Sequence, residues 1–91
     1  MPSTTAAEPS ASSLARFTLR ARAEPAVMPR VLELFAKRGL VPRQWHSATF
    51  GAGDAALRID LEIGIAPEAV EYVANCMRGI VGMETVLATA D

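Results

Sequence analysis

The stretch Leu57-Arg58-Ile59-Asp60-Leu61-Glu62-Ile63 decides which fold this chain adopts. Apolar residues occupy every second position and charged residues the positions between them, which is typical of a β-strand with one buried face. Immediately before it, Gly51-Ala52-Gly53-Asp54 has the composition of a hairpin loop. Leu40 to Phe50 is therefore predicted as the other strand of a hairpin. Pro42 favours an edge position for that strand, because proline cannot donate a ladder hydrogen bond.

A strand and a helix are predicted before this hairpin. Leu14 to Arg22 alternates in the same way, and a chain break follows at Glu24-Pro25. A helix is then expected from about Met28 to Arg38, with Gly39 as its C-terminal stop. Its apolar face carries residues at three- and four-residue spacing: Val27, Val31, Leu34 and Phe35.

A second helix and a final strand complete the predicted fold. Pro67 stands at the preferred first position of the helix, and the strand spans Thr85 to Thr89. The helix has a predicted buried stripe of Val70, Val73, Cys76, Met77 and Ile80. The order βαββαβ predicts an α+β, ferredoxin-like sandwich. Its four-stranded antiparallel sheet has the order 4-1-3-2 and carries both helices on one face.

Length and composition predict one small domain with a protein partner. The chain has 91 residues, and Met1 to Ser13 is rich in Ser, Thr, Ala and Pro, so we expect a flexible tail before a domain over residues 14–91. Apolar residues make up 51% of the chain, which favours burial against another protein. The N-terminus lacks the features of a signal peptide, and no apolar run approaches the ~18 residues of a membrane span. The lone cysteine, Cys76, favours a reducing cytoplasm.

The residues that commonly perform chemistry predict a protein without catalytic activity. His46 is the only histidine, and no Asp or Glu lies close to it in the sequence. Cys76 falls on the apolar stripe, where a packing role is expected. No spacing is typical of a metal site, and Gly51 and Gly53 precede no helix that would hold a phosphate. We expect no cofactor.

An RNA-recognition module has the same topology and is one alternative. That module stacks bases on aromatic side chains of its two central strands. The corresponding positions here are charged or polar, namely Arg16, Thr18, Arg20, Arg22, Arg58, Asp60 and Glu62. The net charge of −1 also disfavours phosphate binding. We expect a solvated face, with cross-strand pairs such as Arg20 with Asp60 or Glu62, and no nucleic-acid partner.

The segment EPAVMPRVLELFAKRGL (Glu24–Leu40) resembles the start of an ACT domain. In that family an E-P-G-V-L segment leads into a helix that ends in L-F-x-R-R-G-F-N-I. The resemblance is closest to the short, single-ACT form of the small regulatory subunit of acetolactate synthase. Arg58–Ile63 looks like the third strand of that family, and Arg78–Val86 looks like its K-L-x-D-V-x-x-V ending.

The resemblance implies a homodimer that pairs edge to edge and binds a small effector, commonly an amino acid. The effector site lies where the first strand–helix loop meets the second strand. In this chain the implied effector or interface residues are Ala26, Val27, Met28, Val41, Pro42 and Trp45. Ala26 replaces the family's loop glycine and Val41 its asparagine, and Val41 has no polar side-chain atom to bond an effector.

The predicted function is therefore that of an activating, non-catalytic small subunit of acetolactate synthase, a thiamine-diphosphate-dependent enzyme of branched-chain amino-acid biosynthesis. It is expected to act by contact with the catalytic subunit. A free-standing homodimeric ACT domain that binds another small molecule is the alternative.

Overall fold

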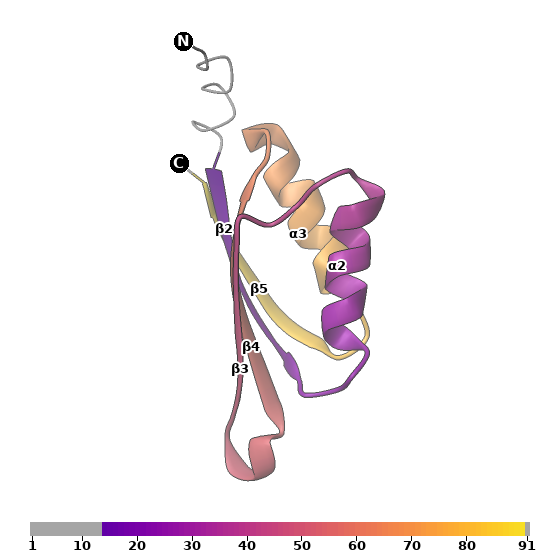
Figure 1. Cartoon of the computed structure of the whole chain (residues 1–91), viewed down its shortest axis with the longest axis vertical. Helices are drawn as coiled ribbons and strands as arrows, with labels where there is room; N and C mark the ends of the chain where they lie inside the picture. Colours follow the sequence, from indigo (N-terminus) through magenta and orange to yellow (C-terminus); the bar gives the residue numbers. More distant parts are fainter. Residues whose placement is uncertain (1–13, 91) are drawn as a thin grey trace.

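The computed structural model describes residues 14–90 and contains a four-stranded antiparallel sheet with two helices on one face (Figure 1). The elements in chain order are β2 (Leu14–Arg22), α2 (Val27–Lys37), β3 (Gln44–Phe50), η1 (Ala52–Asp54), β4 (Ala56–Gly64), η2 (Pro67–Ala69), α3 (Val70–Arg78) and β5 (Met83–Ala90). The strand order β3-β4-β2-β5 confirms the predicted topology and fold class. The predicted tail, Met1 to Ser13, lies outside the described residues.

The core lies between the sheet and the helices, as the alternation of the strands requires. Leu19 at the centre of β2 lies opposite Ile59 on one side and Val86 on the other, and all three are buried. The largest fully buried side chains are Phe17, Phe35, Leu19, Ile59, Ile63, Met77, Val27, Val31 and Val73. Each such side chain stabilises the fold by about 1.5–3 kcal/mol relative to its exposed state.

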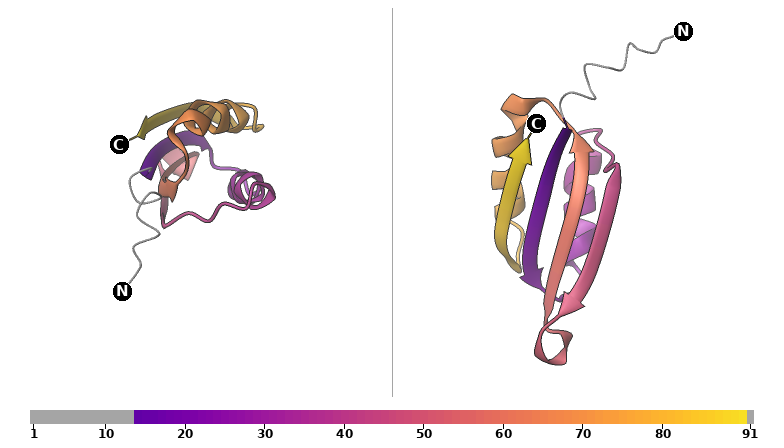
Figure 2. Two further views of the ribbon diagram at one scale, coloured as in Figure 1. Left: turned by 90° about the horizontal axis from the view of Figure 1, so that it is seen from above. Right: turned by 90° about the vertical axis from the view of Figure 1, so that its left-hand side faces the viewer.

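The two helices cover different halves of the sheet. Figure 2 shows α3 behind β5, and α2 behind β4 and β3. In α2 the fully buried residues are Val27, Val31 and Phe35, spaced one turn apart. The helix ends as predicted at Gly39, which has a φ of +69°. The N–H groups of Gly39 and Leu40 bond the carbonyls of Ala36 and Phe35, which is the Schellman arrangement.

The predicted start of the second strand at Leu40 is wrong. β3 begins at Gln44, and the residues before it, Val41 and Pro42 included, form a loop. The N–H of Leu40 is used by the end of α2, and Pro42 has no N–H to donate. Arg43 is the residue whose N–H first reaches β4, 2.7 Å from the carbonyl oxygen of Glu62. β3 is an edge strand, as predicted.

The predicted buried stripe of the second helix is correct at three of its five positions. Val70, Val73 and Met77 are buried, whereas Cys76 and Ile80 are only half-buried. Ala74 is fully buried instead. Cys76 faces α2, where its Sγ lies 3.5 Å from an Arg38 nitrogen.

Candidate functional site

Five of the six residues implied by the family resemblance fall into two groups at opposite ends of α2 (Figure 1), and the sixth lies on β3. Ala26, Val27 and Met28 begin the helix, while Val41 and Pro42 follow its end. An eleven-residue helix is about 16 Å long, so one chain does not bring the two groups together. Trp45, half-buried on β3, packs against the core on the helix side of the sheet.

The loop between β2 and α2 is held firmly by backbone hydrogen bonds. The Ala23 N–H donates to the carbonyl of Ala55 in the loop of the β3–β4 hairpin (2.9 Å), and the Val27 N–H donates to the carbonyl of Glu24 (3.1 Å). No side chain caps the N-terminus of α2, and its first turn contains no acidic residue. No capping side chain and no first-turn carboxylate therefore neutralises the partial positive charge at this helix end.

An apolar strip runs along α2 beside the edge strand β3. Leu34 and Arg38 face α3, because both line a groove shared with that helix. Helical spacing places Met28 and Leu32 on the opposite flank of α2, a helix that lies behind β4 and β3 (Figure 2). Leu32 is 46% exposed and Val41, in the following loop, is 78% exposed. We call Met28, Leu32 and Val41 the β3-edge strip.

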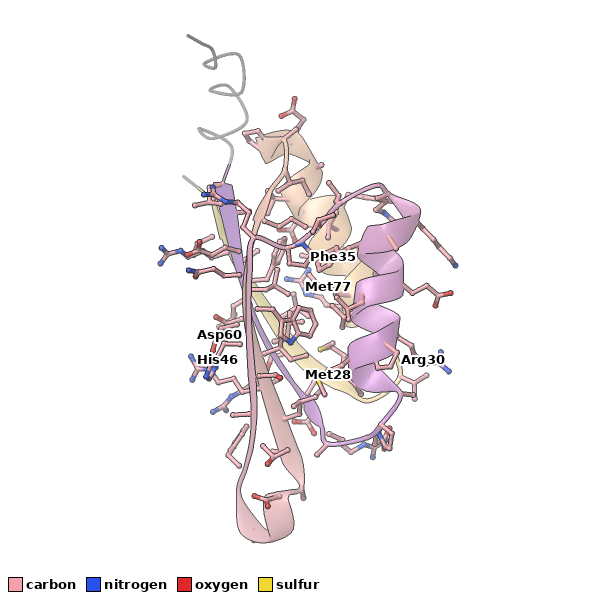
Figure 3. All side chains as sticks on the ribbon, in the orientation of Figure 1. Met28, Arg30, Phe35, His46, Asp60 and Met77 are labelled. Atoms are coloured by element: carbon pink, nitrogen blue, oxygen red, sulfur yellow. The ribbon has the colours of Figure 1, made fainter. Side chains whose placement is uncertain are left out.

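The face of the sheet opposite the helices carries a polar hollow of about 580 Å³. Its lining residues come from three neighbouring strands: Arg16, Phe17, Thr18, Gln44, Trp45, His46, Asp60, Leu61 and Glu62. Figure 3 shows His46 and Asp60 on this side, away from Phe35 and Met77 in the core. His46 lies opposite Asp60 in the register, so the facing of the second strand, which its sequence did not define, is now fixed.

Most charges around the hollow are already paired. Arg16 contacts Glu62 at 2.8 Å, and Asp60 accepts hydrogen bonds from the Arg58 Nε and the Thr18 hydroxyl, both at 2.9 Å. These bonds, that of Arg58 foremost, hold the pKa of Asp60 below its usual 3.8. A carboxylate that is engaged in this way is suited to structure and recognition rather than to proton transfer.

The predicted pairing of Arg20 with Asp60 or Glu62 is wrong. Arg20 lies directly opposite Arg58. Arg16, not Arg20, forms the ion pair with Glu62. The guanidinium of Arg20 lies over the ring of Phe50, 5.1 Å from its centroid. The sequence does not indicate this contact, because it depends on the register between β3 and β4.

A second groove, of about 390 Å³, lies between α2 and α3. Its lining residues are Arg30, Glu33, Leu34, Lys37, Arg38, Cys76, Gly79, Ile80 and Val81. Arg38 donates hydrogen bonds to the Leu34 carbonyl (3.0 Å) and to the Tyr72 hydroxyl (3.3 Å). The bond to Tyr72 raises the pKa of Arg38 above its usual value. No pattern in the sequence points to the contact between Arg38 and Tyr72, because the two residues are 34 positions apart.

Within residues 14–90 the structure holds no group of three or more His, Cys, Asp or Glu residues placed to bind a metal ion. Neither helix there is long and apolar enough to cross a membrane.

Comparison with known proteins places the chain by both sequence and fold. A sequence profile of the family described as ACT-like domain matches residues 7–90. No protein of curated function matches the sequence. Among solved structures, the ACT domain of GTP pyrophosphokinase from Chlorobium tepidum is similar, with a TM-score of 0.69 and 16% identity over 84% of this chain and 96% of that one.

Two other structures share the fold at low identity. The C-terminal domain of the MgtC protein from Mycobacterium tuberculosis has a TM-score of 0.67 and 13% identity, covering 87% of each chain. The regulatory subunit of aspartate kinase from Thermus thermophilus has a TM-score of 0.65 and 16% identity, over 86% of this chain and 51% of that one. At these identities the likeness establishes the fold alone.

Proposed function

The chain belongs to the ACT-like domain family, whose members are typically regulatory, ligand-binding modules, and we propose that it is a small activating subunit of acetolactate synthase. In this proposal the protein is non-catalytic, resides in the cytoplasm and acts through contact with the synthase catalytic chain. The proposal for this enzyme depends on the motifs of Glu24–Leu40, Arg58–Ile63 and Arg78–Val86. The observation that favours a protein interface is the β3-edge strip.

The unpaired edge of β3 and the strip beside it favour a homodimer. An edge strand exposes backbone N–H and C=O groups that a second copy can pair. Leu32 and Val41 add exposed apolar surface at the same edge. If two β3 strands pair antiparallel about a two-fold axis, the two sheets join into one of eight strands, and burial of Leu32 contributes to the association.

This arrangement would assemble the implied effector site from two chains. In an antiparallel pair the start of one β3 lies beside the end of the other. The end of β3 leads into the hairpin, which the Ala23–Ala55 hydrogen bond ties to the β2–α2 loop. Val41 of the partner subunit would thus approach Ala26. The uncapped start of α2 between them is suited to a carboxylate.

The effector response is expected to be weak. Ala26 adds a methyl group where the family's glycine lets a ligand approach the backbone. Val41 supplies no side-chain hydrogen bond, and Pro42 supplies no N–H. Protein contact is therefore the proposed principal function. The double variant Ala26→Gly/Val41→Asn should show a larger thermal shift with branched-chain amino acids than the wild type does.

Light scattering tests the homodimer. The wild type should have twice the 9.7 kDa chain mass, and Leu32→Glu should be a folded monomer. Leu87→Glu is the matched control, since Leu87 is 65% exposed but lies on the opposite edge strand. A dimer that survives Leu32→Glu and dissociates with Leu87→Glu would place the interface at β5 and contradict the proposal.

The alternative, a free-standing ACT dimer that binds another small molecule, is favoured by one observation, the polar hollow beside His46. A screen for thermal shifts with small polar metabolites distinguishes the two proposals. A shift that His46→Ala abolishes, together with no effect on synthase turnover, would favour the alternative.

A further inference from the structure

The groove between α2 and α3 is a surface that the proposed dimer leaves uncovered. Arg30, Leu34 and Arg38 line it from α2, on the flank facing α3. Met28 and Leu32 of the β3-edge strip lie on the opposite flank of the same helix, and the polar hollow lies on the far side of the sheet. In Figure 3 Arg30 projects from α2 on the side away from the sheet. A partner seated in this groove would therefore not compete with the second copy.

Arg38 is held in a fixed position at this groove. Besides the Leu34 carbonyl and the Tyr72 hydroxyl, its guanidinium reaches the Cys76 Sγ at 3.5 Å, and it lies 5.4 Å from the centroid of the Tyr72 ring. All three acceptors are uncharged groups, and within residues 14–90 Arg38 forms no ion pair with a carboxylate. A guanidinium that is held without a counter-charge loses little side-chain entropy when it binds one.

The surroundings of Arg38 are basic at the rim and apolar within. Arg30 forms no ion pair among the described residues, and Lys37 has only a long contact of 3.9 Å with Glu33. Three cations and one carboxylate thus line the groove. Leu34 and Ile80 are half-buried inside it, and Val81 is 69% exposed at its edge. Such a surface is complementary to a segment that carries both acidic and apolar side chains.

We propose that this groove binds an acidic, amphipathic segment of the synthase catalytic chain, with Arg38 pairing a carboxylate of that segment. The inference rests on the proposed function and adds to it the surface of contact and the chemistry of the partner. The apolar side chains of the segment cover Val81 and Ile80, and its carboxylates face the cations of α2. Binding of this kind weakens as salt is raised, because the rim charges are exposed to solvent.

The test is a binding titration of the full chain with the acetolactate synthase catalytic chain from the same genome. Arg38→Glu and Arg30→Glu should each weaken binding by about tenfold or more. Arg30→Glu is the safer of the two, because Arg30 makes no side-chain bond that folding needs. Arg20→Glu is the matched control: it makes the same change of charge on the opposite face of the sheet and should bind as the wild type does.

The possible outcomes separate the groove from the proposed function. Wild-type binding that neither groove variant changes, or that Arg20→Glu weakens equally, overturns the groove as the contact surface and leaves the proposed function standing. Groove variants that convert the free protein from dimer to monomer show that a second copy occupies the groove, which also overturns the inference. Absence of binding by the wild type contradicts the proposed function itself. Thermal melts of each variant confirm that it is folded.

Discussion

Replacing Gly82 with alanine tests how tightly the start of β5 packs against the β2–α2 loop. Gly82 has a φ of +95°, and its carbonyl accepts the Arg22 N–H at 2.9 Å. A Cβ at this position would lie 3.2 Å from Glu24 Oε1 and 3.3 Å from Val27 Cγ2. The glutamate end can swing away, but Val27 is fully buried and cannot.

Two contributions set how far Gly82→Ala lowers the free energy of unfolding. A left-handed backbone costs an L-residue about 1–2 kcal/mol, and overpacking against Val27 costs about 1–3 kcal/mol more. Gly39→Ala is the matched control, because Gly39 has a φ of +69° and nothing within 4 Å of its Cβ position. Gly39→Ala should therefore lower the free energy of unfolding only by the backbone cost, about 1–2 kcal/mol.

Thermal unfolding of both variants and the wild type, at one protein concentration, measures the difference. For a domain of this size 1 kcal/mol lowers Tm by about 4–8 °C, so Gly82→Ala should melt at least about 4 °C below Gly39→Ala. A single concentration is needed because the Tm of a dimer depends on it. Equal Tm values for the two variants would refute the contact between Gly82 and Val27.

Two further predictions concern the core and the open face. Phe35→Ala should lower the free energy of unfolding by about 3–5 kcal/mol, because Phe35 is fully buried. Phe50 is 37% exposed, so Phe50→Ala should lower it far less. Similar denaturation midpoints for the two variants would contradict this prediction. The pKa of Asp60 is lowered in the folded state from its usual 3.8, chiefly by Arg58. The stability that ionised Asp60 contributes is therefore present above the unfolded pKa and is lost as pH falls through the folded pKa. Asp60→Asn should therefore flatten the dependence of the urea midpoint on pH below about pH 4, and a slope identical to that of the wild type would count against it.

The backbone of the fold was predictable from local patterns. The alternation of Leu57–Ile63 confines one face of β4 to the core, and the one-turn spacing of Val27, Val31 and Phe35 does the same for α2. Gly39 marks the end of that helix, because the residue that follows the helix cap there adopts a positive φ, which glycine tolerates best. Each of these features depends on neighbours within a few residues, so the sequence alone specifies them.

Contacts between distant elements were not predictable in the same way. Arg20 was expected to pair with Asp60 or Glu62, but the register sets it opposite Arg58 and beside Phe50. Cys76 was expected in the core, but it is half-buried and contacts Arg38. Contacts of this kind depend on strand register and on the orientation of each helix about its axis. Hydrophobic patterning does not determine these to within one residue.

The turnover of the acetolactate synthase catalytic chain, measured with and without this protein, tests the central claim most directly. The proposal predicts that turnover rises with added protein and saturates, and that the two chains elute together from a sizing column. Arg30→Glu should need about tenfold more protein for the same stimulation, while the control Arg20→Glu should match the wild type. Unchanged turnover at saturating protein, with the two chains eluting separately, would contradict the claim.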